Sequence, residues 1–304
     1  MIVPPYLSPG DTIALAAPAR KISLAEILPA EHWLRSVGFN VFYDDRLFAE
    51  CHQFAGSDEC RARYFQDLLD NEDVKAIWCA RGGYGSARII DRLDFTRFQQ
   101  HPKWICGYSD ITVFHNHLQQ NLQTATLHAT MPINVTDKNT LAAPVTTLLD
   151  ALTGKALSYE IEPHPLSRTT AFSGILTGGN LSMLYSLIGS PSDINTDDKV
   201  LLIEDLDEYL YHIDRMMLNL RRSGKLSHVK ALLVGHLSDM HDNTVPFGKT
   251  AEEIVADCCH NLDIPVIFNV PAGHLPDNRA LRMGCKIEGH YIDNKFIINS
   301  LNHE

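Results

Sequence analysis

The sequence predicts an α/β protein of two domains, the first built on a parallel sheet. In the first half, short apolar runs alternate with segments of helical spacing, which is the pattern of βαβ units. The chain has 304 residues, enough for about two domains of roughly 150 residues each. After Leu281 the chain turns to short alternating strands. An α/β second domain with antiparallel edge strands is therefore expected.

The elements of the first domain follow one another at regular intervals. Strands are expected at 12–17, 40–43, 74–80, 104–106 and 124–127. Helices are expected at 24–37, 58–69, 86–93 and 111–121. In a parallel sheet the carboxyl ends of the strands share one edge, where ligands bind. Residues that directly follow these strands are thus the first candidates for a functional site.

The second domain is expected to begin after an irregular stretch that carries Pro163 and Pro165. We predict a first domain at 1–150, a linker at 151–168 and a second domain at 169–304. Strands are expected at 200–203, 231–234, 266–268, 286–288 and 296–298. Helices are expected near 142–152, from Leu181, at 210–220 with Ile213, Met216, Met217 and Leu220 on one side, and at 251–259.

Composition and charge exclude several classes of protein. The hydrophobic fraction of 45% and the charged fraction of 21% are ordinary for a globular enzyme. A net charge of −11 without a basic cluster disfavours nucleic acid as a partner. No apolar run approaches the ~18 residues of a membrane span, and Pro4, Pro5 and Pro9 interrupt any secretory signal. No membrane association and a cytoplasmic location are expected.

The cysteines and histidines do not predict a metal site. The seven cysteines are irregularly spaced without a C-x-x-C, which argues against a disulfide scaffold and a structural zinc site. Cys79 and Cys106 lie in strand-like runs and are expected in the core. His115 and His117 are two apart on an expected helix and cannot share a face.

Ser109 is the most informative residue. It follows Gly107 and Tyr108 at the end of an apolar run and precedes a helix-compatible segment. A serine in such a strand–turn–helix elbow presents its hydroxyl as a nucleophile. The Asp110 amide would then sit at a helix start, where it can face a developing oxyanion. Ile111 stands where the usual motif has its second glycine, and a helix-capping serine is the alternative interpretation.

Two further glycine-rich segments could approach a ligand closely. Arg81-Gly82-Gly83-Tyr84-Gly85 follows the third expected strand, and its amides could bind an anion or an oxyanion. The segment lacks the third glycine of a dinucleotide loop and the Gly-Lys-Ser/Thr of a phosphate-binding loop. Gly178-Gly179-Asn180 precedes an apolar helix, for which a loop with an asparagine cap is the simpler interpretation.

An acid and a histidine complete a hydrolase set. Glu204 ends an apolar strand, while Asp205, Asp207 and Glu208 are expected to form a solvated helix start. His274 follows a strand and a glycine and is a candidate general base. A paired-carboxylate glycosidase or a metal site could also be built on the acids, but neither has a clear second component.

Taken together, these motifs resemble the L,D-carboxypeptidases, serine peptidases of the muramoyltetrapeptide carboxypeptidase type that are grouped with the microcin C self-immunity peptidases. The resemblance runs from about residue 10 to about residue 298. It is carried by five short motifs in the same order. These are Arg81-Gly82-Gly83-Tyr84-Gly85, Gly107-Tyr108-Ser109-Asp110, Gly178-Gly179-Asn180-Leu181, Leu202-Ile203-Glu204-Asp205 and Gly273-His274.

The resemblance implies a catalytic triad of Ser109 as nucleophile, His274 as base and Glu204 as its orienting acid. It also implies an oxyanion hole from the backbone amides of Gly83 and Asp110. The implied fold is an N-terminal flavodoxin-like domain with a smaller C-terminal swivelling domain, and the implied assembly is a homodimer without metal or cofactor. Candidate substrate-binding residues are Arg81, Tyr84 and Asn180; an arginine suits the substrate's terminal carboxylate or a carboxylate of the protein itself.

The typical reaction of such enzymes is release of the terminal D-alanine from a murein tetrapeptide, in peptidoglycan recycling. The segments 239–249 and 275–278 look individual to this chain, and they could shape the pocket. The alternative is a microcin-type immunity hydrolase that cleaves an aminoacyl-nucleotide or peptidyl-nucleotide amide. A non-catalytic peptide-binding module and a nucleotide-dependent oxidoreductase are disfavoured by the complete triad and by the missing glycine.

Overall fold

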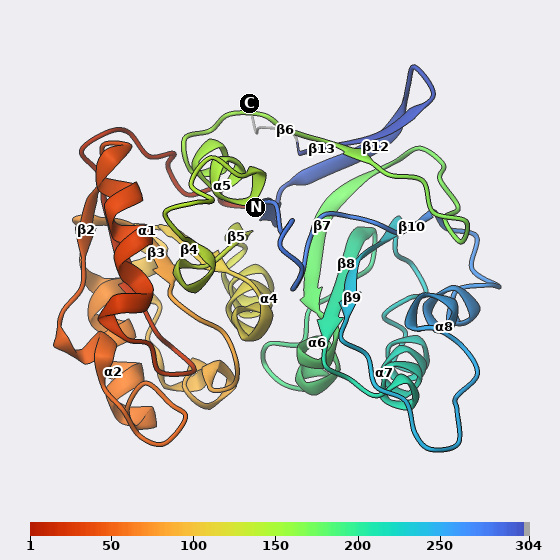
Figure 1. The fold of residues 1–304 in the computed structure, drawn as a ribbon, viewed down its shortest axis with the longest axis horizontal. Coiled ribbons are helices and arrows are strands. Elements are labelled where there is room, and N and C mark those ends of the chain that lie inside the picture. The colour runs from red at the N-terminus through yellow and green to blue at the C-terminus, as the bar shows by residue number, and fades with distance from the viewer. Residues whose placement is uncertain (301–304) are drawn as a thin grey trace.

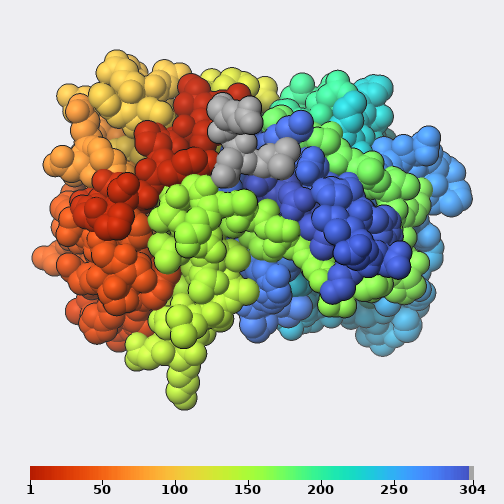
Figure 2. Space-filling model, turned by 90° about the horizontal axis from the view of Figure 1, so that it is seen from above, coloured from red at the N-terminus to blue at the C-terminus, as the bar shows by residue number. Residues whose placement is uncertain are grey.

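The computed structural model describes residues 1–300, which form two α/β halves that lie side by side (Figure 1). The first half, red to yellow in the figure, holds a six-stranded sheet, and the second half, green to blue, is built on a seven-stranded sheet. Seen from above, the yellow-green segment around residue 150 lies between the two halves (Figure 2). No helix within the described residues is long and apolar enough to cross a membrane.

The first sheet has the strand order β11-β5-β4-β3-β1-β2. Its strands are β1 (Thr12–Ala16), β2 (Asn40–Phe42), β3 (Val74–Cys79), β4 (Trp104–Gly107), β5 (Thr126–His128) and β11 (Leu281–Met283). The first five strands pair in parallel in the flavodoxin order 2-1-3-4-5. The parallel flavodoxin-like domain expected from the sequence is confirmed.

Helices cover the first sheet. They are α1 (Leu24–Ser36), α2 (Asp58–Asp70), α3 (Thr96–Gln100), α4 (Thr112–Leu122) and α5 (Ala143–Leu152), with 3-10 turns η1 (Asp45–Phe48), η2 (Ser86–Arg88), η3 (Ile90–Arg92), η4 (Ser109–Ile111) and η5 (Pro132–Asn134). The single helix expected at 86–93 is wrong, because η2 and η3 stand there instead. The Ser86 amide is bound by Asp110 rather than by a preceding turn, and the amides of Ile89 and Arg92 bond three residues back.

The second sheet is mixed, with the order β10-β9-β8-β7-β12-β13-β6. Its strands are β6 (Leu157–Ile161), β7 (Phe172–Asn180), β8 (Lys199–Leu206), β9 (Ala231–Ser238), β10 (Val266–Ile267), β12 (Lys286–Ile292) and β13 (Lys295–Ser300). Strands β7 to β10 run parallel, and β12, β13 and β6 add antiparallel edges. The expected second domain with antiparallel edge strands is confirmed. Strand β6 lies inside the segment 151–168, which the sequence predicts as a linker.

Three helices belong to this half: α6 (Leu181–Leu187), α7 (Leu210–Arg222) and α8 (Ala251–Cys258). The expected apolar side of α7, with Ile213, Met216, Met217 and Leu220, is buried. Strand β8 is buried on both faces, as a near-continuous apolar run in a parallel sheet should be. Val200 and Leu202 join the large core that extends from the first half, while Leu201 and Ile203 face α6 to α8.

Several contacts join the halves, and two of them position the site. Strand β11, which comes from the C-terminal part of the chain, pairs antiparallel with β5 at the edge of the first sheet. Helix α4 packs against β7 and α6, between the two sheets (Figure 1). These contacts bring the carboxyl ends of β3 and β4 close to those of β7 and β8, which is where the motif residues lie.

Candidate active site

Ser109 occupies a strained elbow between β4 and α4. Its φ of 63° lies in the left-handed region, which a serine rarely adopts and which is typical of nucleophile elbows. The turn is held from behind, because the His115 ring contacts the Gly107 carbonyl at 2.9 Å through Nε2. Burial lowers the pKa of His115 to about 4. The ring is therefore neutral and donates its Nε2–H to that carbonyl.

His274 and Glu204 form a hydrogen-bonded pair. The distance from His274 Nδ1 to Glu204 Oε2 is 2.8 Å. Glu204 is fully buried near the end of β8, and the His274 side chain is 11% exposed. Gly273 permits this approach, because a Cβ at that residue would lie 2.9 Å from Glu204 Oε2 and its φ is 120°. The pair therefore leaves Nε2 as the ring nitrogen available for other contacts.

The pKa of His274 is raised by its acidic surroundings. Burial lowers this pKa, but the Glu204 hydrogen bond and the charges of Glu204, Asp205 and Asp239 outweigh it and raise the pKa overall. A negative environment stabilises the imidazolium that forms when a histidine accepts a proton. The pair is thus suited to a general base that holds a proton transiently.

A cavity of about 480 Å³ brings most of the candidate residues together. It is lined by Arg20, Arg81, Gly82, Gly83, Tyr108, Ser109, Asp110, Met131, Ile133, Asn180, Ser182, Met183, Asp205, Leu206, Asp207, Glu208 and His274. Ser109 and His274 both face it, with Glu204 behind the histidine. Tyr84 is a candidate that does not line it: the residue is 48% exposed, and its ring centroid lies 6.1 Å from that of Phe54.

The glycine-rich loop after β3 and the elbow after β4 are tied together by Asp110. Its Oδ2 accepts a hydrogen bond from the Ser86 amide at 2.8 Å, and the side chain is buried. Burial raises the pKa of this carboxyl, although the bonds from Ser86 oppose the shift. A Cβ on Gly82 would lie 3.0 Å from Ser109 Cβ. Gly82 is thus the glycine next to the serine, and Gly83 and Asp110 line the same cavity.

Arg81 contacts a carboxylate of the protein itself, which is one of the two roles expected for it. Its Nη1 lies 3.5 Å from Glu26 Oε1, a carboxylate of the protein that also caps α1, and the residue still lines the cavity. A second guanidinium, Arg20, lines the same cavity. Sequence reasoning missed Arg20, yet it lies just past the end of β1, at the sheet edge where ligands bind.

Asn180 holds the second half of the site in place. Its Oδ1 accepts from the Met183 amide at the start of α6, and its Nδ2 donates to Asp205 Oδ1 at 3.0 Å. The predicted asparagine cap is confirmed, but Gly178 and Gly179 end strand β7 instead of forming a loop. The Asn180 amide donates to Thr112 Oγ1 on α4, so this segment contacts the first half directly.

The expectation of a solvated acidic helix start at 205–208 holds for Asp207, whose side chain is 72% exposed, but is wrong for Asp205. Asp205 is 1% exposed, and burial, with the neighbouring Glu204 charge, raises its pKa to about 7. Asp207 and Glu208 line the cavity and pair with His241 and His212, at 2.5 and 2.6 Å. These acids follow a buried parallel strand, so the sheet-edge rule applied to Glu204 would also have found them.

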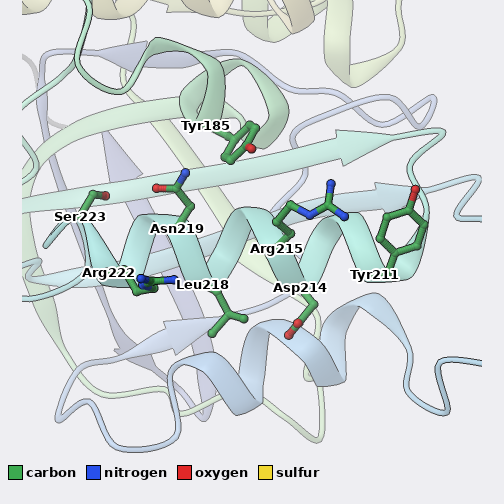
Figure 3. A pocket seen from close by; sticks show the side chains of 8 residues that line it. All are labelled: Tyr185, Tyr211, Asp214, Arg215, Leu218, Asn219, Arg222 and Ser223. Carbon is green, nitrogen blue, oxygen red and sulfur yellow. The ribbon is translucent and has the colours of Figure 1, made fainter.

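Other features of the surface do not compete with this site. A cavity of about 760 Å³ runs along the outer side of α7 (Figure 3), and its lining residues lie outside the five motifs. Within residues 1–300, no three histidine, cysteine, aspartate or glutamate side chains gather as metal ligands would. His115 contacts Gly107 and His117 contacts Ser192, which places the two rings on different sides of α4, as expected.

Comparison with known proteins finds matches to both halves of the chain. Residues 13–129 match the LD-carboxypeptidase N-terminal domain and residues 173–288 its C-terminal domain. A Bacillus subtilis (strain 168) protein named "Probable murein peptide carboxypeptidase" is 33% identical over 290 residues, which is 93% of this chain and 90% of that relative.

Solved structures agree with this match. The crystal structure of muramoyltetrapeptide carboxypeptidase from Oxalobacter formigenes has a TM-score of 0.84 at 28% identity and covers 96% of this chain and 99% of its own. The microcin C7 self-immunity protein MccF has a TM-score of 0.85 at 20% identity, with 98% of each chain covered. At that identity the second likeness shows the fold alone.

Proposed function

The chain belongs to the LD-carboxypeptidase family, and from this premise we propose that it is a serine carboxypeptidase that hydrolyses an L,D-peptide bond. The proposed reaction releases the terminal D-alanine of a murein tetrapeptide, in which the alanine follows the L-centre of a diamino acid. Relatives named as murein peptide and muramoyltetrapeptide carboxypeptidases support this substrate class. The proposed reaction would serve peptidoglycan recycling.

In the proposed mechanism the Ser109 hydroxyl attacks the carbonyl carbon of the scissile bond. Its proton passes to His274 Nε2, while Glu204 holds Nδ1–H and stabilises the imidazolium. The amides of Gly83 and Asp110 donate to the oxyanion of the tetrahedral intermediate. His274 then protonates the departing amine of D-alanine, and the acyl group remains on Ser109.

Water completes the cycle by the same route. His274 takes a proton from a water molecule that attacks the acyl-enzyme, and the proton returns to Ser109 Oγ as the ester bond breaks. The observation that carries the proposal is the 2.8 Å bond between His274 and the buried Glu204, at the wall of a cavity that the strained Ser109 also lines. An arginine pair on the same cavity suits the terminal carboxylate of the substrate.

Mass spectrometry of the protein incubated with L-Ala-γ-D-Glu-diamino acid-D-Ala tests the proposal. We expect the loss of one alanine residue from the peptide, and no loss with Ser109→Ala. An isomer that ends in L-alanine is the matched control and should stay intact. Full activity of Ser109→Ala would refute the nucleophile, and an intact tetrapeptide with the parent protein would refute the substrate.

Chelation tests whether the reaction needs a metal. The proposed steps use only side chains and backbone amides, and none of them depends on the several kcal/mol of charge stabilisation that a Lewis acid supplies. We therefore expect the initial rate of D-alanine release to stay within about twofold after dialysis against EDTA. The measurement compares rates before dialysis, after it, and after added zinc. Activity lost to EDTA and restored by zinc would contradict the mechanism.

A microcin-type immunity hydrolase is the second candidate. The whole-chain likeness to MccF at a TM-score of 0.85 supports a fold that accommodates either substrate. The same triad would cleave an aminoacyl-nucleotide or peptidyl-nucleotide amide. Parallel assays with the tetrapeptide and an aspartyl sulfamoyl adenosine conjugate distinguish the two, since the preferred substrate should show the higher kcat/KM.

We further propose that the protein works in the cytoplasm as a homodimer, with domains at 1–150 and 169–304 joined by the segment 151–168. The resemblance to the family supports each of these points. Light scattering of the purified protein should give about twice the chain mass of 34.0 kDa. A monomer mass at working concentrations would remove the dimer from the proposal.

A further inference from the structure

A second cavity, of about 320 Å³, lies on the other side of the catalytic histidine. It is lined by Tyr108, Thr130, Asn134, Asn139, Ala142, Pro144, Val145, His274, Leu275, Pro276 and Asn278. Of these residues, Tyr108 and His274 also line the catalytic cavity. The two cavities therefore share one wall, and that wall contains the proposed general base. The volume is within the range of small-ligand pockets, about 300–1,000 Å³.

The shared wall is fixed in place. The Tyr108 and His274 rings meet edge to face, with centroids 4.8 Å apart. Tyr108 donates its hydroxyl hydrogen to Asn134 Oδ1 at 3.3 Å. Asn278, which is 4% exposed, accepts from the Gly273 amide beside the histidine at 3.1 Å. The second cavity is thus built around the same residues that orient the base.

The lining of the second cavity differs in charge from that of the first. Among the described residues that line it, His274 and the Tyr108 hydroxyl are the only ionisable groups, and the others are amide, hydroxyl or apolar side chains. The catalytic cavity, in contrast, carries Arg20 and Arg81 as well as Asp205, Asp207 and Glu208. Neutral amides and small apolar surfaces are the partners of peptide backbone and of methyl side chains.

This difference decides which part of a peptide each cavity suits. On the leaving side of a carboxypeptidase there is a single residue with a carboxylate, and that group needs a cation. The arginines of the catalytic cavity supply one, whereas the second cavity has no arginine or lysine among its described lining residues. Only the acyl side of the substrate extends further than one residue. An additional uncharged cavity next to the base can therefore serve only the acyl side.

We propose that the second cavity binds the residues of a peptide substrate that precede the diamino acid. This inference rests on the proposed function, because it assigns a subsite to the same reaction. Leu275, a residue that is 46% exposed, contributes an apolar surface at this site, and the side chains of Asn134 and Asn139 contribute amides. Binding here lets the enzyme distinguish a tetrapeptide from a shorter peptide with the same scissile bond.

The test fills the second cavity from the side far from the triad. Ala142, just before α5, is exposed and lines the cavity. We expect Ala142→Trp to lower kcat/KM for L-Ala-γ-D-Glu-Lys-D-Ala by about tenfold, the effect of ~1.4 kcal/mol of lost binding. It should leave kcat/KM for Nα-acetyl-Lys-D-Ala unchanged. Leu141→Trp is the matched control, since Leu141 is adjacent, 89% exposed and outside the lining.

Each other outcome overturns the inference. An equal loss for both substrates would place the cavity on the leaving side or indicate damage to the base. No loss for either substrate would show that the second cavity is unused.

A binding measurement separates the subsite from the proposed function. If the parent protein cleaves neither peptide, the proposed function fails, and calorimetry tests whether the second cavity still binds peptide. Ser109→Ala should then bind the tripeptide L-Ala-γ-D-Glu-Lys about tenfold more tightly than Ser109→Ala with Ala142→Trp; equal affinities would reject the subsite.

Discussion

The Ser109 backbone lies in the left-handed region although serine has a Cβ, a conformation that costs of order 1–3 kcal/mol. The surroundings fix it from two directions: His115 binds the carbonyl of Gly107 in the preceding strand, and Asp110 is bonded to the loop after β3. Strain of this kind persists at sites where exposure of one side chain matters more than stability. This backbone geometry fits the proposed nucleophile better than a helix cap, since Tyr108 and not Ser109 occupies the cap position of η4.

Glu204→Gln should lower kcat by about 10⁴-fold, the scale seen when the triad acid is replaced by its amide. Glutamine can donate to His274 Nδ1, which moves the ring proton to Nε2, where the base must be free to accept. The readout is kcat for D-alanine release, with the unfolding midpoint as a check on folding. Exposed Glu162→Gln is the matched control, and activity of Glu204→Gln near that of the parent would contradict the assignment.

The pH profile should report the raised pKa of His274. Because the neutral ring is the base, kcat/KM should fall as the pH drops through that pKa, so the acid limb should have its midpoint above the ordinary histidine value of 6.5. Asp239→Asn removes one of the charges that raise the pKa and should move this midpoint to lower pH. Asp263→Asn, in the loop after α8, should leave it in place, and a midpoint below 6.5 in the parent would contradict the geometry.

At the scale of elements, the end of β7 determines how closely the two halves approach. Gly179 lies against the first turn of α4, where a Cβ would be 2.6 Å from Thr112 Oγ1. Gly179→Ala should destabilise the protein by about 3 kcal/mol, combining an unfavourable φ with a steric clash. Urea denaturation measures the loss, and Thr112→Ala in the same protein should recover the steric part of it.

Gly189→Ala is the control for the backbone contribution. Gly189 also has a positive φ, of 81°, but a Cβ added there would have no atom of the described residues within 4 Å beyond its immediate chain neighbours. Its substitution should cost only the strain of the backbone, about 1 kcal/mol. Equal losses at the two glycines would mean that β7 and α4 do not approach as closely as the structure indicates.

The same elements show how far the sequence could be interpreted. The alternation of apolar runs and helical spacing predicts the parallel sheet because most strands of the first half are buried and regular. Strand β7 was missed because Gly178 and Gly179 are typical of a loop; in the structure they let the strand end against α4. Strand β11 was missed because three residues carry too little pattern, and its pairing with β5 depends on tertiary structure.

The candidate site, like the fold, was predictable where local sequence pattern determines it and not where tertiary packing does. Ser109 follows β4 closely and Glu204 lies near the end of β8, so the sheet-edge rule selects both as candidates. His274 lies seven residues beyond the end of β10, and the family resemblance selects it more strongly than its place in the chain. Asp207 and Glu208 follow β8 directly, and local spacing predicts a solvated position for them but not that they line the cavity. Their place on the cavity wall depends on how the second half packs on the first, which no local pattern encodes.

At the scale of the whole molecule, the two halves share structure that should make them unfold together. Strand β11 belongs to the C-terminal part of the chain but completes the first sheet. On it, the buried Arg282 donates to the carbonyls of Ala151 and Lys155, at 3.1 and 2.7 Å, next to the end of α5. One continuous apolar core also extends from the first sheet to residues of β7, β8 and β9. Separation of the halves would expose all of these contacts.

We therefore expect a single cooperative unfolding transition. All three tryptophans, Trp33, Trp78 and Trp104, lie in the first half, so their fluorescence reports that half alone, while far-UV circular dichroism reports both. The two midpoints in guanidinium chloride should coincide. Arg282→Lys loses the planar fork that binds several carbonyls. It should lower the free energy of unfolding by about 2 kcal/mol and shift both midpoints together to lower guanidinium chloride concentration. The exposed Arg63→Lys should change neither, and separate midpoints in the parent would show that the halves unfold independently.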